Sequence, residues 1–158
     1  MNIDKDSYFL EKAIDRAIKN ISENGGPFGA LIVENGTIIS ESGNRVRIIN
    51  DPTAHAEVEA IRKACATKNT YSLENCTIYC SCEPCPMCLS AIYWARISRI
   101  VFAASKLDAA RAGFDDKYIY DEIAKPIDLR TIETIQIETK KNTDAFKKWA
   151  AYIDKLDY

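Results

Sequence analysis

The order of elements predicted between residues 76 and 104 constrains the fold more than any other feature of this sequence. Apolar runs predict strands at residues 76–81 and 100–104, and residues 86–95 between them are predicted to form a helix. Two strands joined through a helix lie parallel, because the crossover returns the chain to the edge where the first strand began. This segment therefore predicts an α/β protein with helices packed on its sheet.

A hairpin is predicted before this unit and a weaker strand after it. The apolar segments 30–33 and 37–39 flank an Asn-Gly pair at residues 35–36, which is the strongest short signal for a two-residue hairpin turn. Ile135 and Ile137 indicate a fifth strand. Since hairpin strands are antiparallel and the crossover strands are parallel, we expect a mixed sheet.

Three further helices are predicted from apolar residues at helical spacing. The first follows a cap at Asp6 or Ser7 and ends before residues 25–27 (GGP), the second runs from 53 to 65, and the third follows Thr143. The second helix is expected to bury Val58, Ile61 and Cys65. The third is expected to be amphipathic, with an apolar face of Phe146, Trp149, Ala150 and Ile153. We therefore expect one domain over the whole chain, a three-layer α/β/α sandwich with a mixed central sheet.

Composition and charge argue against two classes of partner. The 158 residues are 47% hydrophobic and 28% charged, which is typical of a globular domain that buries its own core. The net charge is −2 without a basic block, which argues against binding nucleic acid or anionic membranes through charge. No stretch approaches the roughly 18 to 20 apolar residues of a spanning helix, and residues 1–6 lack the apolar core of a signal peptide. We therefore expect a cytoplasmic protein.

The six cysteines are unevenly distributed, because five of them fall between residues 76 and 88. A disulfide framework would tie distant segments together, and thiols in the cytoplasm are reduced. The clustering therefore indicates metal or redox chemistry. For Cys65 and Cys76 we favour simple burial as small apolar residues.

Two short segments hold the candidate chemistry. The sequence TAHAE contains His55, the only histidine, and PCPMC contains Cys85 and Cys88, which share one face of a helical first turn and can bind one ion. Three ligands leave a tetrahedral zinc open to water, as in a catalytic site. Glu57 then stays free to act as a base. The combination of H-x-E with P-C-x-x-C is the signature of zinc-dependent base deaminases.

Three other interpretations of these residues stay open. A lone histidine is most often a surface residue or a satisfied core residue, which would leave His55 without a function. A structural zinc site would form if Cys80 or Cys82 supplied a fourth thiolate and closed the coordination sphere. Cys85 and Cys88 would alternatively form a C-x-x-C redox pair.

Longer runs resemble a known family. The residues similar to the cytidine deaminase superfamily are 25–30 (GGPFGA), 50–57 (NDPTAHAE) and 81–88 (SCEPCPMC). Residues 92–96 (IYWAR), residues 112–116 (AGFDD) and the terminal Tyr158 resemble the bacterial guanine deaminases of that superfamily. The resemblance covers nearly the whole chain.

This resemblance implies a zinc-dependent aminohydrolase that converts guanine to xanthine and ammonia. It implies one zinc per chain on His55, Cys85 and Cys88, with Glu57 as the proton shuttle. It also implies a homodimer in which the segment 143–158 is swapped to the partner subunit. The resemblance does not account for Cys80, Arg45 and Arg47.

Guanine chemistry is compatible with the base contacts that the resemblance implies. Guanine offers N–H donors beside its C2 amino group and acceptors at O6 and N7, which suit the carboxylate of Asp116 and the amide of Asn44. The rings of Phe28, Trp94 and Phe114 are expected to line the pocket. Tyr158 of the partner subunit is expected to close it. Alternatives are a core position for Trp94, a solvated turn at Asp116 and a frayed Tyr158.

The substrate also has alternatives. Guanosine, cytosine, a pterin or the adenosine of a tRNA would use the same zinc chemistry. A protein that binds zinc structurally without catalysis is the remaining class.

Overall fold

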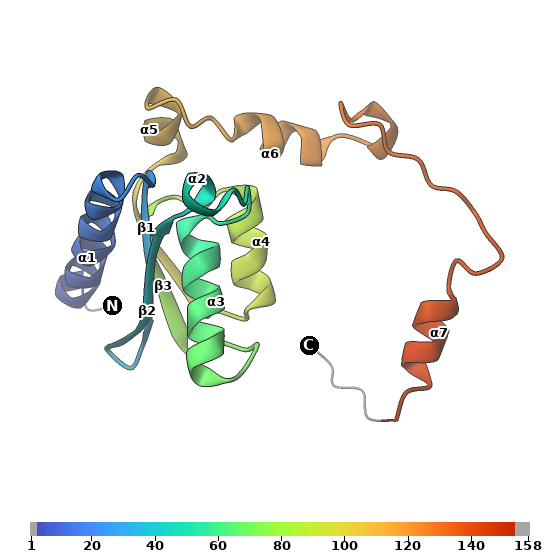
Figure 1. Ribbon diagram of the computed structural model, residues 1–158, viewed down its shortest axis with the longest axis horizontal. Coiled ribbons are helices and arrows are strands. Elements are labelled where there is room, and N and C mark those ends of the chain that lie inside the picture. Colours follow the sequence, from blue (N-terminus) through green and yellow to red (C-terminus); the bar gives the residue numbers. More distant parts are fainter. Residues whose placement is uncertain (1–2, 154–158) are drawn as a thin grey trace. The chain divides into compact units, whose positions relative to one another are not determined.

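A mixed four-stranded sheet organises the first of two compact units, Met1–Lys117 and Tyr118–Tyr158, in this computed structural model (Figure 1). The structure describes residues 3–153. The strands are β1 (Gly26–Glu34), β2 (Thr37–Asn44), β3 (Cys76–Cys82) and β4 (Arg99–Ala104). Their order is β2-β1-β3-β4, with β1 antiparallel to both neighbours and β3 parallel to β4. The predicted crossover and mixed sheet are confirmed.

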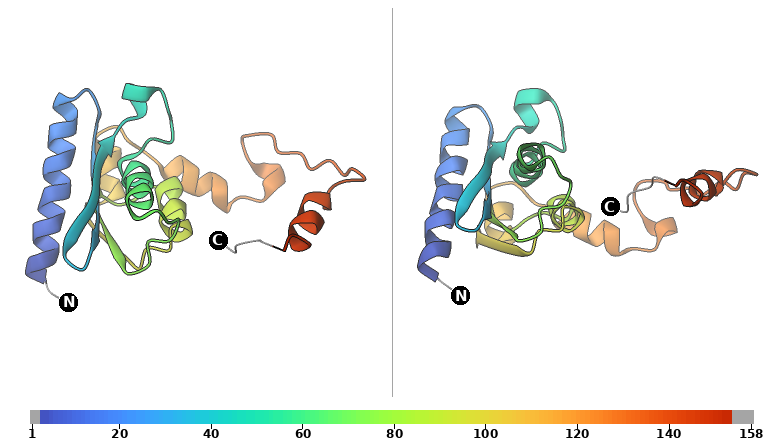
Figure 2. Two further views of the ribbon diagram at one scale, coloured as in Figure 1. Left: turned by 60° about the horizontal axis from the view of Figure 1, so that its bottom comes forward. Right: turned by 90° about the horizontal axis from the view of Figure 1, so that it is seen from below.

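Helices cover both faces of this sheet. The helix α1 (Ile3–Ser22) lies on one face, and α3 (Ala56–Lys68) and α4 (Pro86–Trp94) lie on the other (Figure 2). This arrangement confirms the three-layer α/β/α sandwich. The short helices α2 (Val46–Ile49) and α5 (Lys106–Arg111) complete the unit and were not expected from the sequence. No helix among the described residues is long and apolar enough to cross a membrane.

The hairpin between β1 and β2 has the predicted turn. Asn35 and Gly36 both have positive φ, 50° and 81°. Two consecutive residues with positive φ define the turn whose twist matches antiparallel strands, and Asn-Gly adopts it at low cost. The predicted hairpin is confirmed, and its two strands extend beyond the apolar segments 30–33 and 37–39.

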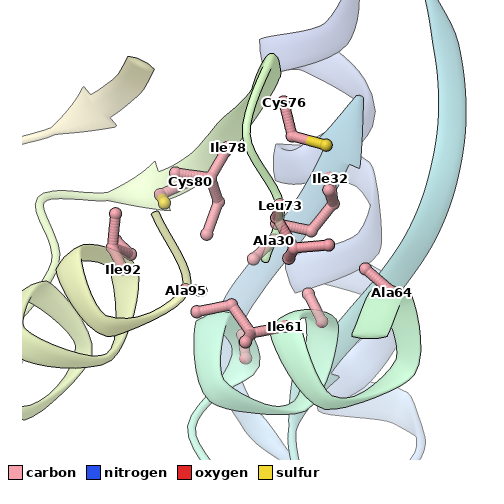
Figure 3. Close-up of a cluster of buried hydrophobic side chains, with 12 residues drawn as sticks. Ala30, Ile32, Ile61, Ala64, Leu73, Cys76, Ile78, Cys80, Ile92 and Ala95 are labelled. Atoms are coloured by element: carbon pink, nitrogen blue, oxygen red, sulfur yellow. The ribbon is translucent and has the colours of Figure 1, made fainter. Parts of the chain in front are cut away.

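The core forms on both sides of β1, because successive side chains of a strand point to opposite faces. Ala30 and Ile32 of β1 meet Ile78, Ile61 and Ile92 between the sheet and the two-helix layer (Figure 3). On the other face, the core residues that pack under α1 are Phe9, Ala13, Leu31, Val33 and Tyr79. Burial on both faces explains why β1 is a continuous apolar run rather than an alternating one.

Two helix predictions need correction in detail. The helix α1 begins at Ile3, upstream of the expected caps at Asp6 and Ser7. The helix α3 begins at Ala56 rather than 53, because His55 is extended (φ −68°, ψ 157°) and caps it. Its buried face is Ala56, Glu57, Ala60, Ile61 and Ala64, whereas Val58 and Cys65 are only half-buried. The buried face of α3 is therefore rotated by about one residue from the predicted face.

The second unit contains helices and irregular chain. Its helices are α6 (Lys117–Ala124), the 3-10 helix η1 (Ile127–Leu129) and α7 (Asp144–Ala150). The predicted fifth strand at Ile135 and Ile137 is wrong for the described chain, because these residues have no strand partner to satisfy their backbone groups. The helix after Thr143 is confirmed, but it ends at Ala150, so Ile153 lies beyond it and does not belong to its apolar face. No side chain among residues 118–153 is buried.

Candidate active site and metal centre

One edge of the sheet gathers the candidate site residues. The register pairs Gly26 at the start of β1 with Asn44 at the end of β2, and Cys82 at the end of β3 with Ala104 at the end of β4. Because β1 is antiparallel to β3, the beginning of β1 lies at the same edge as these three strand ends. Chain segments that leave this edge therefore meet one another.

His55, Cys85 and Cys88 come together there. His55 caps α3, Cys85 caps α4, and Cys88 follows in the first turn of α4. Nδ1 of His55 lies 3.6 Å from Sγ of Cys85 and 3.5 Å from Sγ of Cys88, and the two sulfurs are 3.5 Å apart. Ligand atoms at the corners of a tetrahedral zinc site are about 3.3–3.8 Å apart, given bonds of roughly 2.0–2.3 Å. The three donors therefore have the spacing that zinc requires.

Local sequence explains how α4 presents its thiols. Pro86 occupies the first helical position, where its missing N–H costs no hydrogen bond. Cys85 before it is extended (φ −65°, ψ 168°), as the residue preceding a proline prefers. Both α3 and α4 direct their N-termini, with their partial positive charge, at the donor group, which favours thiolates.

The electrostatics of the group favour the thiolate of Cys85 and disfavour that of Cys88. The hydrogen bond between the thiols and the neighbouring His55 lower the pKa of Cys85 to about 4, against the opposing effect of burial. The hydrogen bond with Cys85, burial and the charge of Glu57 raise the pKa of Cys88. The hydrogen bond with Cys85 also raises the pKa of His55. A bound zinc dication would favour both thiolates.

Glu57 lies beside the donor group without belonging to it. Its side chain is 8% exposed in the first turn of α3, and burial raises the pKa of its carboxyl. The charge of Cys85 raises this pKa further, whereas the charge of His55 lowers it. A buried carboxyl next to a metal site can hold a proton near neutral pH, which is what a general acid and base requires.

No fourth cysteine closes the site among the described residues. The group that can hold a metal contains His55, Cys85 and Cys88 alone. Cys80 is 1% exposed within the core, and Sγ of Cys82 lies 3.6 Å from the carbonyl oxygen of Ser105. Burial raises the pKa of Cys82 to about 11, which disfavours the thiolate that zinc binds. This arrangement supports an open, catalytic zinc site over a closed structural one.

Four of the residues expected to contact the base lie near this edge. Asn44 is 9% exposed at the end of β2. Asp116 is half-buried, burial raises the pKa of its carboxyl, and the charge of Cys85 adds to the effect. The rings of Phe28 and Phe114 pack edge to face with centroids 4.9 Å apart. Asp116 is therefore not a fully solvated turn residue.

Trp94 and Tyr158 are placed differently. Trp94 is 68% exposed, so its interpretation as a core residue is wrong. It lies at the far end of α4, about 13 Å along the helix axis from Cys85. The structure does not bring Trp94 beside the metal group of its own chain, and Tyr158 lies outside the described residues.

The sequence interpretation overlooked Asn20. This residue continues the buried face of Phe9, Ala13 and Ala17 on α1 and is itself fully buried. A polar side chain at an apolar position of the helical repeat was the available signal.

The comparisons with known proteins agree with this geometry. Residues 3–104 match the family described as the cytidine and deoxycytidylate deaminase zinc-binding region, so the chain belongs to this family of zinc-dependent deaminases. It is 50% identical to guanine deaminase of Bacillus subtilis over 151 residues. This alignment covers 95% of this chain and 97% of that protein. The X-ray structure of the same Bacillus subtilis protein superposes with a TM-score of 0.95, covering 96% of this chain and 98% of that one.

More distant relatives differ in the substrates that their names give. A tRNA-specific adenosine deaminase of Aquifex aeolicus is 43% identical over 106 residues, covering 67% of this chain and 69% of that protein. A solved structure of guanine deaminase from Nitrosomonas europaea has a TM-score of 0.66 at 32% identity, covering 68% of this chain and 63% of that one. The names of these relatives thus include both guanine and tRNA adenosine as substrates.

The ligand set can be tested by metal analysis of two serine variants. Because Cys82 lies outside the donor group, Cys82→Ser is expected to retain one zinc per chain. Cys85→Ser removes one of three ligands and is expected to lose the metal. Inductively coupled plasma mass spectrometry of both purified variants measures this. Zinc retained by Cys85→Ser and lost by Cys82→Ser would favour the closed structural site.

Proposed function

We propose that this protein catalyses the hydrolytic deamination of guanine to xanthine and ammonia. The observation that carries the proposal is the three-ligand group with the buried carboxyl of Glu57 beside it. This group occurs in a chain that is 50% identical to a guanine deaminase over nearly its whole length. The reaction consumes one water and releases one ammonia per guanine.

Glu57 has the central role in the proposed mechanism. His55, Cys85 and Cys88 would hold zinc, which would lower the pKa of a water placed for attack on C2 of guanine. Glu57 takes the proton from this water and delivers it to the C2 amino group, which leaves as ammonia. Its raised pKa suits this task, because the carboxyl must hold the proton between the two transfers.

The base is proposed to bind between polar and aromatic side chains. Asn44 donates to an acceptor of guanine, and Asp116 accepts from an N–H group on the opposite edge. Phe28 and Phe114 pack against the flat ring. Trp94, exposed at the far end of α4, would reach a base only in the site of a second copy.

Deamination of tRNA adenosine is the second candidate, because a tRNA-specific relative is 43% identical to this chain. That relative covers 67% of the chain, whereas the guanine deaminase covers 95%. A net charge of −2 also disfavours a polyanionic substrate. We therefore favour the free base.

Ammonia release from a substrate panel tests the proposed reaction. Zinc-loaded protein is expected to release ammonia from guanine, with xanthine appearing in equal amount, because the base fits both polar contacts. Guanosine, cytosine, cytidine, adenine and an adenosine-containing tRNA anticodon stem are the comparison substrates. Protein stripped of zinc by a chelator is the control. Faster turnover of any comparison substrate would replace guanine in the proposal.

The role of Glu57 can be tested with its amide variant. Glu57→Gln removes the proton carrier and is expected to lower kcat by at least roughly 10²–10⁴-fold while zinc and fold are retained. Glu59→Gln on the same helix makes the same charge change at a residue paired with Arg62, and serves as the control. Steady-state kinetics with guanine distinguish the two. Near-normal turnover by Glu57→Gln would remove this residue from the mechanism.

We also propose that the working unit is a homodimer that exchanges the segment 143–158. Residues 118–153 bury no side chain, although they include Ile132, Ile135 and Ile137 at 76%, 69% and 75% exposure. The first unit has apolar surface to offer a second copy. An apolar groove of about 350 Å³ runs beside α1 and is lined by Ile14, Ile18, Phe28, Ala109 and Phe114.

The outer edge of the sheet supports the same proposal. Among the described residues β4 pairs only with β3, so its other edge is free to bind an extended segment. The segment 132–137, which contains three exposed isoleucines, would suit such a position in a second copy. In this arrangement the chain forms one domain completed by its partner, whose Tyr158 closes the base pocket.

Truncation tests the proposed lid. Deleting residues 156–158 is expected to leave zinc and fold intact and to lower guanine turnover by about tenfold or more, because water would enter the site. Lys147→Ala, an exposed change on α7, is the control. Light scattering is expected to give a dimer for the full chain. Unchanged kinetics after truncation, or a fully active monomer, would contradict the exchange.

We further propose a cytoplasmic location. The two thiolates that hold zinc require reduced cysteines, which the cytoplasm maintains. All six cysteines are free thiols in the structure.

A further inference from the structure

Asn20 is a buried amide at the interface between α1 and the sheet. Its Nδ2 donates to the carbonyl oxygens of Gly26 at 2.7 Å and Asn44 at 2.8 Å. Its Oδ1 accepts from the guanidinium of Arg16 at 3.0 Å. Both N–H groups are therefore used, and they bind the first residue of β1 and the last residue of β2.

The surrounding backbone is fitted closely to this side chain. A Cβ atom at Gly43 would lie 2.1 Å from Oδ1 of Asn20, and one at Gly25 would lie 2.1 Å from its Nδ2. Both distances are far below van der Waals contact, so only glycine leaves room for the amide. The ends of both strands are thus fixed against one side chain of α1.

Asn44 is held in one orientation by its own contacts. Its Oδ1 accepts from the backbone N–H of Val46 at 3.2 Å, and since only an oxygen can accept there, the amide cannot be flipped. Its Nδ2 makes no hydrogen bond within residues 3–153. Asn44 therefore presents two free N–H donors, which match an acceptor such as O6 or N7 of guanine.

The same segment is tied to the metal site. The backbone N–H of Arg45 donates to the carbonyl oxygen of Ala54 at 2.8 Å, next to His55. The position of Asn44 relative to the metal ligands is therefore set by hydrogen bonds on both sides, from Asn20 on α1 and from Ala54.

We propose that Asn20 is a positioning residue for base recognition. It fixes the end of β2 so that the amide of Asn44 meets the purine at the correct distance from the metal site. It acts only through Asn44 and does not touch the substrate. This inference rests on the proposed role of Asn44 in binding guanine, and it adds a residue of α1 that determines how well that contact is made.

A double-mutant cycle separates positioning from general stability. Asn20→Ala leaves the carbonyl of Asn44 without this donor and is expected to raise KM for guanine about tenfold or more, the effect of one misplaced hydrogen bond. The contact lies away from C2, so kcat is expected to change by less than about twofold. In an Asn44→Ala background, Asn20→Ala is expected to have no further effect on KM. Additive effects of the two substitutions would overturn the proposal.

Tyr79→Phe is the matched control for lost stability. The Tyr79 hydroxyl donates to Asp6 of α1 at 2.7 Å, so this change also removes a part-buried hydrogen bond between α1 and the sheet. Both variants are expected to unfold at lower temperature, but only Asn20→Ala should change KM. An equal rise in KM for Tyr79→Phe would show that loosening α1 is sufficient, which contradicts a specific role for Asn20.

A second variant tests the same contact without altering Asn20. Gly43→Ala places a methyl group at 2.1 Å from Oδ1 and must displace the amide. It is expected to raise KM as Asn20→Ala does, and to do so even if Asn20→Ala fails to fold. A Gly43→Ala protein with normal KM would overturn the proposal.

Failure of the proposed function gives a different result. A wild-type protein that does not turn over guanine refutes the reaction and leaves the geometry to be tested by hydrogen exchange. The Val46 amide, which binds Oδ1 of Asn44, is then expected to exchange faster in Asn20→Ala than in Tyr79→Phe. Equal exchange in the two variants would overturn the positioning role independently of any substrate.

Discussion

The meeting of two helix N-termini at one edge of the sheet is the constraint on which the site depends. The helices α3 and α4 each begin with a metal-ligand candidate in extended conformation, His55 and Cys85. The sheet register sets the distance between them, because β1 pairs antiparallel with both β2 and β3, so the ends of β2 and β3 flank the beginning of β1 on either side. Three donor atoms within 4.8 Å follow from this arrangement without a disulfide or a long loop.

The elements that sequence patterns predicted well are those with local causes. The Asn-Gly turn, the crossover from β3 to β4 and the start of α4 at Pro86 depend on residues close in sequence. The ligand spacing of Cys85 and Cys88 is likewise a property of one helical turn. The three-layer sandwich follows from such local units, because each needs a partner for its apolar face.

The remainder depends on contacts that no local pattern encodes. The isoleucines at 135 and 137 have the alternation of a strand, yet a strand exists only where a neighbour satisfies its backbone groups. The exposure of Trp94 depends on which surface covers the end of α4. Asn20 was missed because its bonds reach residues 6 and 24 positions away. Spacing along the chain identifies the reactive groups more readily than the groups that position them.

The close approach of Asn20 to Gly43 has a consequence for how this protein can change over evolution. The amide at 20 and any side chain at 43 compete for the same volume, because a Cβ at 43 falls 2.1 Å from the amide oxygen. A single substitution at 43 is therefore opposed by Asn20. If both residues were substituted together, with a small residue at 20 and a larger one at 43, a side chain of β2 would fill the volume that the amide of α1 now occupies. These two positions are thus constrained to vary in concert, and a lineage can pass from one solution to the other only through a less stable intermediate.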